Sequence, residues 1–180
     1  MRSSEQLLAF HIHFECMFLK PYICPAGKPT IGIGMTFYPN GKTVTMNDKP
    51  LANRHEAIKL WRELIITFER QVESLTKGVT LSQNQFDALV DFQYNSGRLL
   101  QSTLLKKIKT NPKDKSIWGE FLKYTKARAD NDKKDNDGDG LTDEPGELGD
   151  YLGLIRRRNA EAHLYFLGEI NYYEQLKMAA

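Results

Sequence analysis

Three side chains near the N-terminus have types and a spacing that suit acid catalysis. Glu15 ends a helical apolar pattern, a turn rich in Pro and Gly carries Cys24, and a short β-type run carries Thr30. A carboxyl group at a helix end, facing a thiol and a hydroxyl, places a proton donor opposite groups that hold or activate water. Because Glu15 follows the apolar Phe14, partial burial favours its neutral, proton-donating form. The sequence therefore indicates Glu15 as a general acid.

Local patterns around this stretch predict a helix, a turn and a hairpin. Ser3 or Ser4 can cap a first helix, whose apolar residues recur up to Pro21. Residues 28–46 are rich in β-formers and are interrupted by Pro39-Asn40-Gly41, and an Asn-Gly pair between such runs predicts a hairpin.

The remainder of the chain has mainly helical periodicity. An amphipathic pattern over 51–76 predicts one long helix that Gly78 ends. Ser82 and Gln85 have the spacing of a capping box at the start of the next helix. Three further helices are expected, at 102–111, around 117–122 and from Leu152 onward.

Composition is that of an ordinary water-exposed globular domain. The 180 residues are 41% hydrophobic and 27% charged, which suits one domain. There is no apolar run long enough for a transmembrane helix and no N-terminal secretory pattern, so cytoplasmic accumulation is expected. Two cysteines are too few for a disulfide framework and fit a reducing compartment. We expect Cys16 to be a small buried residue, while a Cys16–Cys24 disulfide stays open.

Charge is unevenly distributed along the chain. Residues 130–150 hold nine acidic residues against two lysines, a net −7 within a total of +2, so the rest carries +9. A basic body suits any polyanion, including an anionic cell wall, and the absence of an aromatic-interleaved basic patch argues against nucleic acid.

Several motifs together resemble a known enzyme family. The spacing Glu15-x8-Cys24-x5-Thr30 resembles the Glu-x8-Asp/Cys-x5-Thr triad of the bacteriophage-type lysozymes, the endolysin and muramidase family of glycoside hydrolases. Residues 27–34, Gly-Lys-Pro-Thr-Ile-Gly-Ile-Gly, are similar to that family's Gly-x-x-Thr-Ile-Gly-x-Gly. Blocks at 81–97 and 153–165 are similar to two further signatures in the same order.

The resemblance implies an α+β, lysozyme-like fold in a single domain. An N-terminal lobe of about 1–50 would carry the β-hairpin, a helical lobe would follow over about 51–180, and the cleft would lie between them. The implied reaction is hydrolysis of the β-1,4 bond between N-acetylmuramic acid and N-acetylglucosamine in peptidoglycan, without a catalytic cofactor. A monomer that does not insert into the membrane, released through a partner such as a holin, is expected.

The resemblance also implies roles for individual residues. Glu15 would protonate the leaving oxygen, with Cys24 and Thr30 on the opposite side of the bond. Cys24 stands where an ordinary glycosidase has a carboxylate, and it can act as a nucleophile, hold water or only shape the site. Arg157 is the arginine expected to approach Glu15.

Two polar residues of the third predicted helix are candidates for contact with sugar hydroxyls. These are Gln85 and Asn95. An equally good interpretation is that Asn95, shortly before Gly97, belongs to the helix end.

The acidic insert departs from the lysozyme pattern. Asp135, Asp137, Asp139 and Asp143 lie in an Asp-x-Asp-x-Asp-Gly run that resembles calcium loops, so the 135–147 loop is a candidate structural calcium site. The Glu at position twelve of an EF-hand loop is absent, because that position is Gly146. A solvated acidic loop is the alternative.

Three other functions remain open on sequence grounds. The same acid can drive lytic transglycosylation to a 1,6-anhydro product. The chain can also be an inactive wall-binding module, with Cys24 as the lesion, or a calcium-responsive interaction protein that depends on the insert.

Overall fold

The computed structural model describes residues 1–24, 26–128 and 148–176, and these form six helices and four short strands. The α+β class expected from the sequence is confirmed. The predicted calcium residues Asp135, Asp137, Asp139 and Asp143 lie outside the described residues, so calcium binding stays a prediction. None of the described helices is long and apolar enough to cross a membrane.

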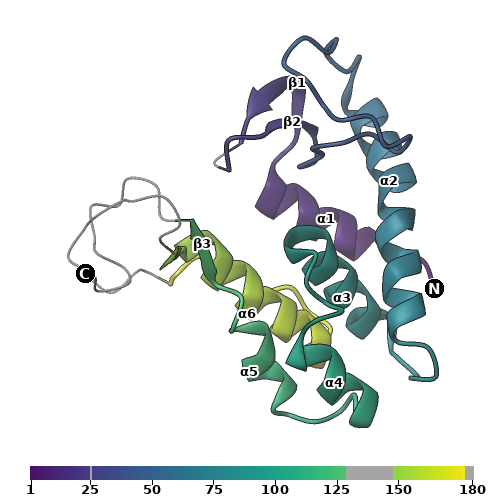
Figure 1. Cartoon of the computed structure of the whole chain (residues 1–180), viewed down its shortest axis with the longest axis vertical. Coiled ribbons are helices and arrows are strands. Elements are labelled where there is room, and N and C mark those ends of the chain that lie inside the picture. Colours follow the sequence, from purple (N-terminus) through teal and green to yellow (C-terminus); the bar gives the residue numbers. More distant parts are fainter. Residues whose placement is uncertain (25, 129–147, 177–180) are drawn as a thin grey trace.

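The N-terminal part consists of a helix followed by a two-stranded antiparallel sheet. Helix α1 spans Glu5–Glu15, strand β1 spans Phe18–Ile23 and strand β2 spans Pro29–Gly32. The register pairs Tyr22 with Thr30 and Ile23 with Pro29. Figure 1 shows this sheet at one end of the molecule, beside the start of α2.

The predicted extension of the first helix to Pro21 is wrong. Ser4 caps α1 as expected, but the helix ends at Glu15, because Cys16 adopts φ 59° and turns the chain away. Pro21 lies inside β1, in the stretch where the register with β2 is irregular, and a residue without an N–H group is tolerated at such an irregularity. The predicted burial of Cys16 is also wrong: its side chain is exposed, and both cysteines are free thiols.

The hairpin predicted over 28–46 forms only in part. Its first run pairs backward with β1 rather than forward across the Asn-Gly turn. Around that turn the pairing is a single bridge between Phe37 and Thr43. Strand β2 therefore pairs with the strand that precedes it in the chain, and not with the residues beyond the Asn-Gly turn.

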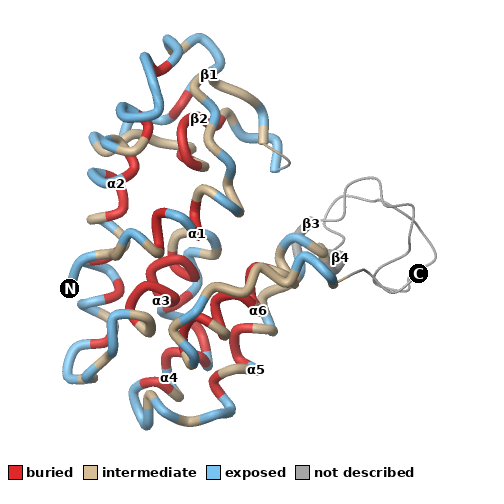
Figure 2. The backbone as a smooth tube through the Cα atoms, turned by 180° about the vertical axis from the view of Figure 1, so that it is seen from behind, coloured by how far each residue is buried: buried red, intermediate tan, exposed pale blue. Residues whose placement is uncertain are grey.

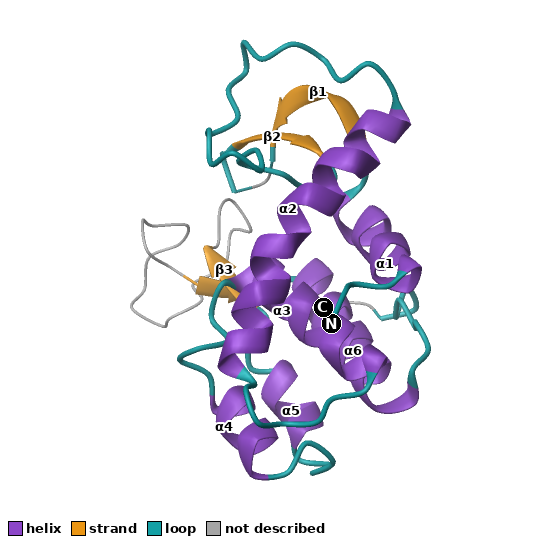
Figure 3. Ribbon diagram, turned by 90° about the vertical axis from the view of Figure 1, so that its right-hand side faces the viewer, coloured by secondary structure: helices purple, strands orange, loops and turns teal. Residues whose placement is uncertain are grey.

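A long helix joins two hydrophobic cores. Helix α2 spans Arg54–Leu75 and runs from the sheet along the other helices (Figure 3). Its Ala57 and Leu64 belong to a small core under the sheet, whereas Trp61 and Val72 belong to a large helical core. Because one buried face of α2 contacts both cores, the helix fixes the sheet relative to the helical part.

The large core is built from five other helices. These are α1, α3 (Gln83–Ser96), α4 (Thr103–Thr110), α5 (Ile117–Phe121) and α6 (Leu152–Leu167). Helix α3 packs against α6, and Figure 2 shows buried stretches gathered on α1, α3 and α6. Helix α1 thus packs with the helical part even though it precedes the sheet in sequence.

Helix ends follow the local signals in the sequence. Ser82 and Gln85 form the predicted capping box, and Gly97 ends α3 in the left-handed conformation at φ 64°. The sequence did not predict β3 (Lys126–Arg128) and β4 (Leu148–Asp150), which pair antiparallel; β3 precedes the acidic insert and β4 forms its end.

Candidate active site

Glu15 is the last residue of α1, and its carboxyl group is mostly enclosed. The side chain is 20% exposed, and Arg157 of α6 donates a hydrogen bond from Nη1 to Glu15 Oε1. The Arg157 guanidinium also lies 5.6 Å from the ring centre of Phe14. The structure thus brings Arg157 to Glu15, as the resemblance implied.

The carboxyl group rests directly on the backbone of Gly34. A Cβ atom placed on Gly34 would lie 2.5 Å from Glu15 Oε2 and 2.7 Å from its Cδ. Gly34 also has φ +66°, a conformation that residues with a side chain rarely adopt. Two independent constraints therefore require glycine here, and one of them is the position of Glu15.

Cys24 and Thr30 meet at the turn that joins β1 to β2. The Cys24 N–H donates to the Lys28 carbonyl at 3.0 Å, and the Gly27 N–H donates to the Cys24 carbonyl at 2.8 Å. Thr30 lies on β2, with only 1% of its surface exposed. Its hydroxyl proton has two acceptors within reach, the Lys28 carbonyl at 3.0 Å and the Cys24 sulfur, and can serve one at a time.

The environment of Cys24 favours its thiolate. Burial alone raises the pKa of the thiol, but hydrogen bonds from the Thr30 side chain and from backbone N–H groups, with the nearby Lys28 charge, outweigh burial. The net result is a pKa below the usual value for cysteine. A thiolate is a better base and nucleophile than a neutral thiol.

Tyr22 is a site residue that the sequence analysis missed. Burial, followed by the charges of Glu15 and Cys24, raises the pKa of Tyr22 to about 12. Its hydroxyl is therefore a neutral donor within electrostatic reach of both groups. Tyr22 also contacts the exposed Phe18, with ring centres 4.5 Å apart. The sequence feature that could have identified Tyr22 as a site residue is its position two residues before Cys24.

Buried partners of Arg157 were also missed. Asp91 of α3 receives hydrogen bonds from Arg157 Nε at 2.9 Å and Nη2 at 2.7 Å, and His11 Nε2 lies 2.8 Å from Asp91 Oδ1. Asp91 follows Val90 in an apolar stretch and His11 follows Phe10, so no local pattern indicates that they meet.

The two predicted sugar contacts lie at opposite ends of α3. Asn95 is exposed near Gly97 and accepts a hydrogen bond from Arg158 Nη2 at 2.8 Å. Gln85 belongs to the first turn, where its amide accepts from the Ser82 N–H and donates to the Pro112 carbonyl. The structure does not bring Gln85 to Glu15, and contact of either residue with sugar stays a prediction.

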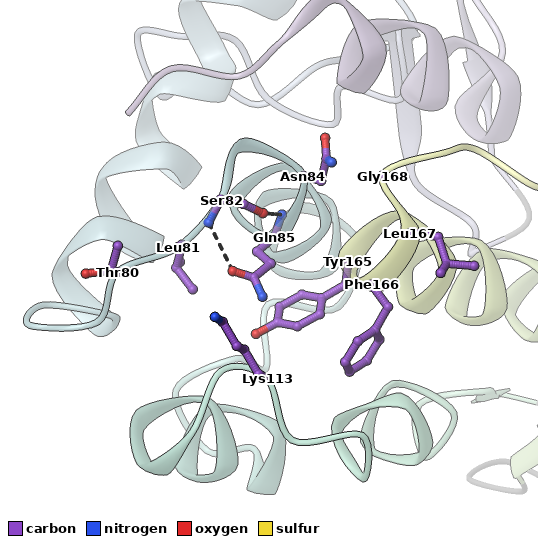
Figure 4. A pocket seen from close by; sticks show the side chains of 10 residues that line it. All are labelled: Thr80, Leu81, Ser82, Asn84, Gln85, Lys113, Tyr165, Phe166, Leu167 and Gly168. Atoms are coloured by element: carbon purple, nitrogen blue, oxygen red, sulfur yellow. Dashed lines mark hydrogen bonds between the residues drawn. The ribbon is translucent and has the colours of Figure 1, made fainter.

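Gln85 instead lines a separate cavity. This cavity has a volume of about 540 Å³ and lies between the start of α3 and the end of α6 (Figure 4). Tyr165 and Lys113 are among its lining residues, whereas Glu15, Cys24 and Thr30 are not.

Comparisons with known proteins identify the family of this chain. The phage lysozyme family model matches residues 12–161. An endolysin of Acyrthosiphon pisum secondary endosymbiont phage 1 is 30% identical over 167 residues, which cover 92% of this chain and 98% of that protein.

Solved structures give the same result. An endolysin from Escherichia coli O157:H7 phage FAHEc1 superposes with a TM-score of 0.77 at 26% identity, covering 95% of this chain and 97% of that one. The muramidase domain of SpmX from Asticaccaulis excentricus superposes with a TM-score of 0.67 at 25% identity, covering 91% and 97%. The chain therefore belongs to the phage lysozyme family of peptidoglycan hydrolases.

Proposed function

We propose that this lysozyme cleaves the β-1,4 bond between N-acetylmuramic acid and N-acetylglucosamine, with Glu15 as the general acid. The observation that carries the proposal is the seating of the Glu15 carboxyl group on Gly34, with only 20% of the side chain exposed. A seated carboxyl group delivers its proton from a fixed position. Glu15 would donate this proton to the leaving 4-oxygen of N-acetylglucosamine.

Cys24 and Thr30 would act on the opposite face of the sugar. The lowered pKa of Cys24 supports a thiolate that takes a proton from water while Thr30 orients that water. In this scheme water attacks the anomeric carbon directly, and the product has the inverted configuration. A thiolate that attacks the carbon itself would instead give retention through a covalent intermediate.

The products of purified peptidoglycan distinguish these reactions. Digestion in ¹⁸O-labelled water should give N-acetylmuramic acid reducing ends that carry one labelled oxygen. Unlabelled 1,6-anhydro products would show transglycosylation, and reducing ends at N-acetylglucosamine would refute the proposed bond. NMR of the first products should show the α-anomer, whereas the β-anomer would show retention and contradict direct attack by water.

A comparison of binding with cleavage tests the inactive-module alternative. If the wild-type protein sediments with walls under reducing conditions but releases no fragments, the chain is a binding module. Recovery of activity in Cys24→Asp would then identify Cys24 as the lesion. The proposal predicts release of fragments by the wild type itself.

The proposed route to the wall is accumulation in the cytoplasm as a monomer, followed by release through a partner such as a holin. The relatives named endolysins support a role in lysis. Expression in a bacterial host with and without a holin tests this route, because rapid loss of culture turbidity should require both proteins. Lysis by this chain alone would contradict it.

A further inference from the structure

A buried polar chain connects the helical core to Glu15 and has no assigned role in the proposed reaction. It runs from Trp61 of α2 through His11 of α1 and Asp91 of α3 to Arg157 of α6. His11 and Asp91 are 0% exposed, and Arg157 is 3% exposed. Charged and polar groups buried this deeply are costly unless each has a partner.

The hydrogen bonds fix the tautomer of His11. The Trp61 indole N–H donates to His11 Nδ1 at 2.8 Å, so Nδ1 is an acceptor and carries no proton. The ring proton is then on Nε2, which lies 2.8 Å from Asp91 Oδ1. His11 thus approaches Asp91 through Nε2 while Trp61 holds it at Nδ1.

Asp91 in turn fixes Arg157. Its two carboxylate oxygens accept from Arg157 Nε and Nη2 at 2.9 and 2.7 Å, a two-point contact that sets the plane of the guanidinium. Only Nη1 is left to reach Glu15. Glu161 Oε1 lies farther from Arg157 Nε, at 3.9 Å, so the two-point hold on the guanidinium comes from Asp91.

Other titratable groups surround this chain. Burial raises the pKa of Glu161 well above its usual range, although Arg158 Nη2 lies 2.6 Å from its Oε1. Burial also raises the pKa of Tyr94, which donates to the Ile33 carbonyl at 2.8 Å, above its usual value. From the sheet side, Tyr22 lies within electrostatic reach of both Glu15 and Cys24.

Among these groups Asp91 is the fixed negative charge beside Arg157. Burial alone would raise the pKa of Asp91, but Arg157 and His11 hold it well below the usual range. Asp91 is therefore ionised across the neutral pH range and offsets the charge of Arg157.

We propose that Asp91 and His11 are positioning residues for the general acid. Asp91 holds Arg157 by two contacts and offsets its charge, so that Glu15 receives one hydrogen bond from a cation whose charge is opposed. His11 holds Asp91 in the orientation that this requires. The inference rests on the proposed role of Glu15.

The pH profile distinguishes this role from a merely structural one. In Asp91→Asn the charge of Arg157 is opposed less, so ionised Glu15 is favoured and the protonated acid is lost at lower pH. In a plot of kcat against pH, measured on wall fragments, the alkaline limb should move to lower pH by about 1 to 2 units. A shift of this size is expected when the positive charge of Arg157 acts on Glu15 without a negative charge to oppose it. Lost packing alone would lower activity without moving the limb.

Asp87→Asn is the matched control. Asp87 lies one turn earlier on α3 and is also 0% exposed, but it accepts from Ser4 and Gln83 rather than from Arg157. This variant should leave the limb in place even if its Tm falls. An unmoved limb in Asp91→Asn, or an equal shift in both variants, would overturn the proposal.

His11 is tested by a pair of substitutions. His11→Leu removes the donor to Asp91 and should lower kcat with little change in KM, whereas His11→Gln restores an N–H donor and should recover part of kcat. If glutamine is no better than leucine, His11 has no positioning role.

A measurement without substrate separates this inference from the proposed function. Carboxyl-carbon NMR can follow the titration of Glu15, whose midpoint should fall in Asp91→Asn but not in Asp87→Asn. That result would support the link from Asp91 to Glu15 even if Glu15→Gln kept its activity, an outcome that would refute only the catalytic role of Glu15. An unchanged midpoint in Asp91→Asn would refute the inference even in an active enzyme.

Discussion

Replacing Gly34 with alanine should damage the position of Glu15 more than the stability of the fold. The new Cβ would lie 2.5 Å from Glu15 Oε2, whereas an ordinary contact begins near 3.4 Å. The carboxyl group must therefore move by roughly 0.9 Å, and a displacement of about 1 Å at a reacting group costs about 100-fold in rate. We expect kcat/KM of Gly34→Ala to fall about 100-fold, or about 2.7 kcal/mol of transition-state stabilisation.

Gly41→Ala provides the matched control for backbone strain. Gly41 has φ +83° and a Cβ there would have no atom within 4 Å, so the substitution strains the backbone without touching Glu15. Each variant should lose about 1 to 2 kcal/mol of folding stability, because a left-handed conformation costs about that much with a side chain. This corresponds to about 2 to 4 °C in Tm per kcal/mol.

The assay is the initial rate of turbidity loss of purified peptidoglycan, corrected for the folded fraction by circular dichroism. Gly41→Ala should keep wild-type kcat/KM after this correction. If Gly34→Ala also stays within about twofold of wild type, or falls no further than Gly41→Ala, Glu15 is not seated as described.

Three further outcomes follow from the structure. Cys24→Asp should stay active and move the acid limb of the pH–rate profile downward, because aspartate ionises near pH 3.9; an unmoved limb would show that Cys24 is not the base. The pKa of Glu120 is about 2, against an ordinary 4.5, since hydrogen bonds from Lys107 and Lys123 outweigh its burial. Its stabilisation is therefore present above pH 4.5 and is lost as the pH falls through 2, so thermal unfolding should show Glu120→Gln below wild type at pH 7 and level with it near pH 2. A constant gap in Tm would contradict this. Ser82→Ala removes the cap of α3 and should cost about 1 kcal/mol in urea unfolding, whereas no loss would mean that the cap contributes nothing.

Signals carried by neighbouring residues in the chain predicted much of this structure. Ser82 with Gln85 predicted the start of α3, and Gly97 marked its end, because caps depend on residues within one turn. The spacing of Cys24 and Thr30 predicted that they meet at one tight turn, because few residues separate them. A shared site with Glu15 stays a prediction.

Features that depend on distant pairing could not be predicted from local sequence patterns. The β-type run that contains Thr30 had two available partners, and the sequence favoured the Asn-Gly turn over the preceding strand, where Pro21 suggested a helix end. Asp91 and Arg157 are 66 residues apart, and each lies in an ordinary helical pattern. Only packing of α3 against α6 brings them together.

The central claim is that Glu15 supplies the proton for cleavage of peptidoglycan. The most direct test is turbidity loss of purified walls by wild type, Glu15→Gln and Glu63→Gln, since Glu63 is an exposed carboxylate on α2 that serves as a control. Loss of a general acid costs about 100-fold to 10,000-fold, so we predict that Glu15→Gln falls within that range while Glu63→Gln matches wild type. Clearance of walls by Glu15→Gln at the wild-type rate would contradict the account.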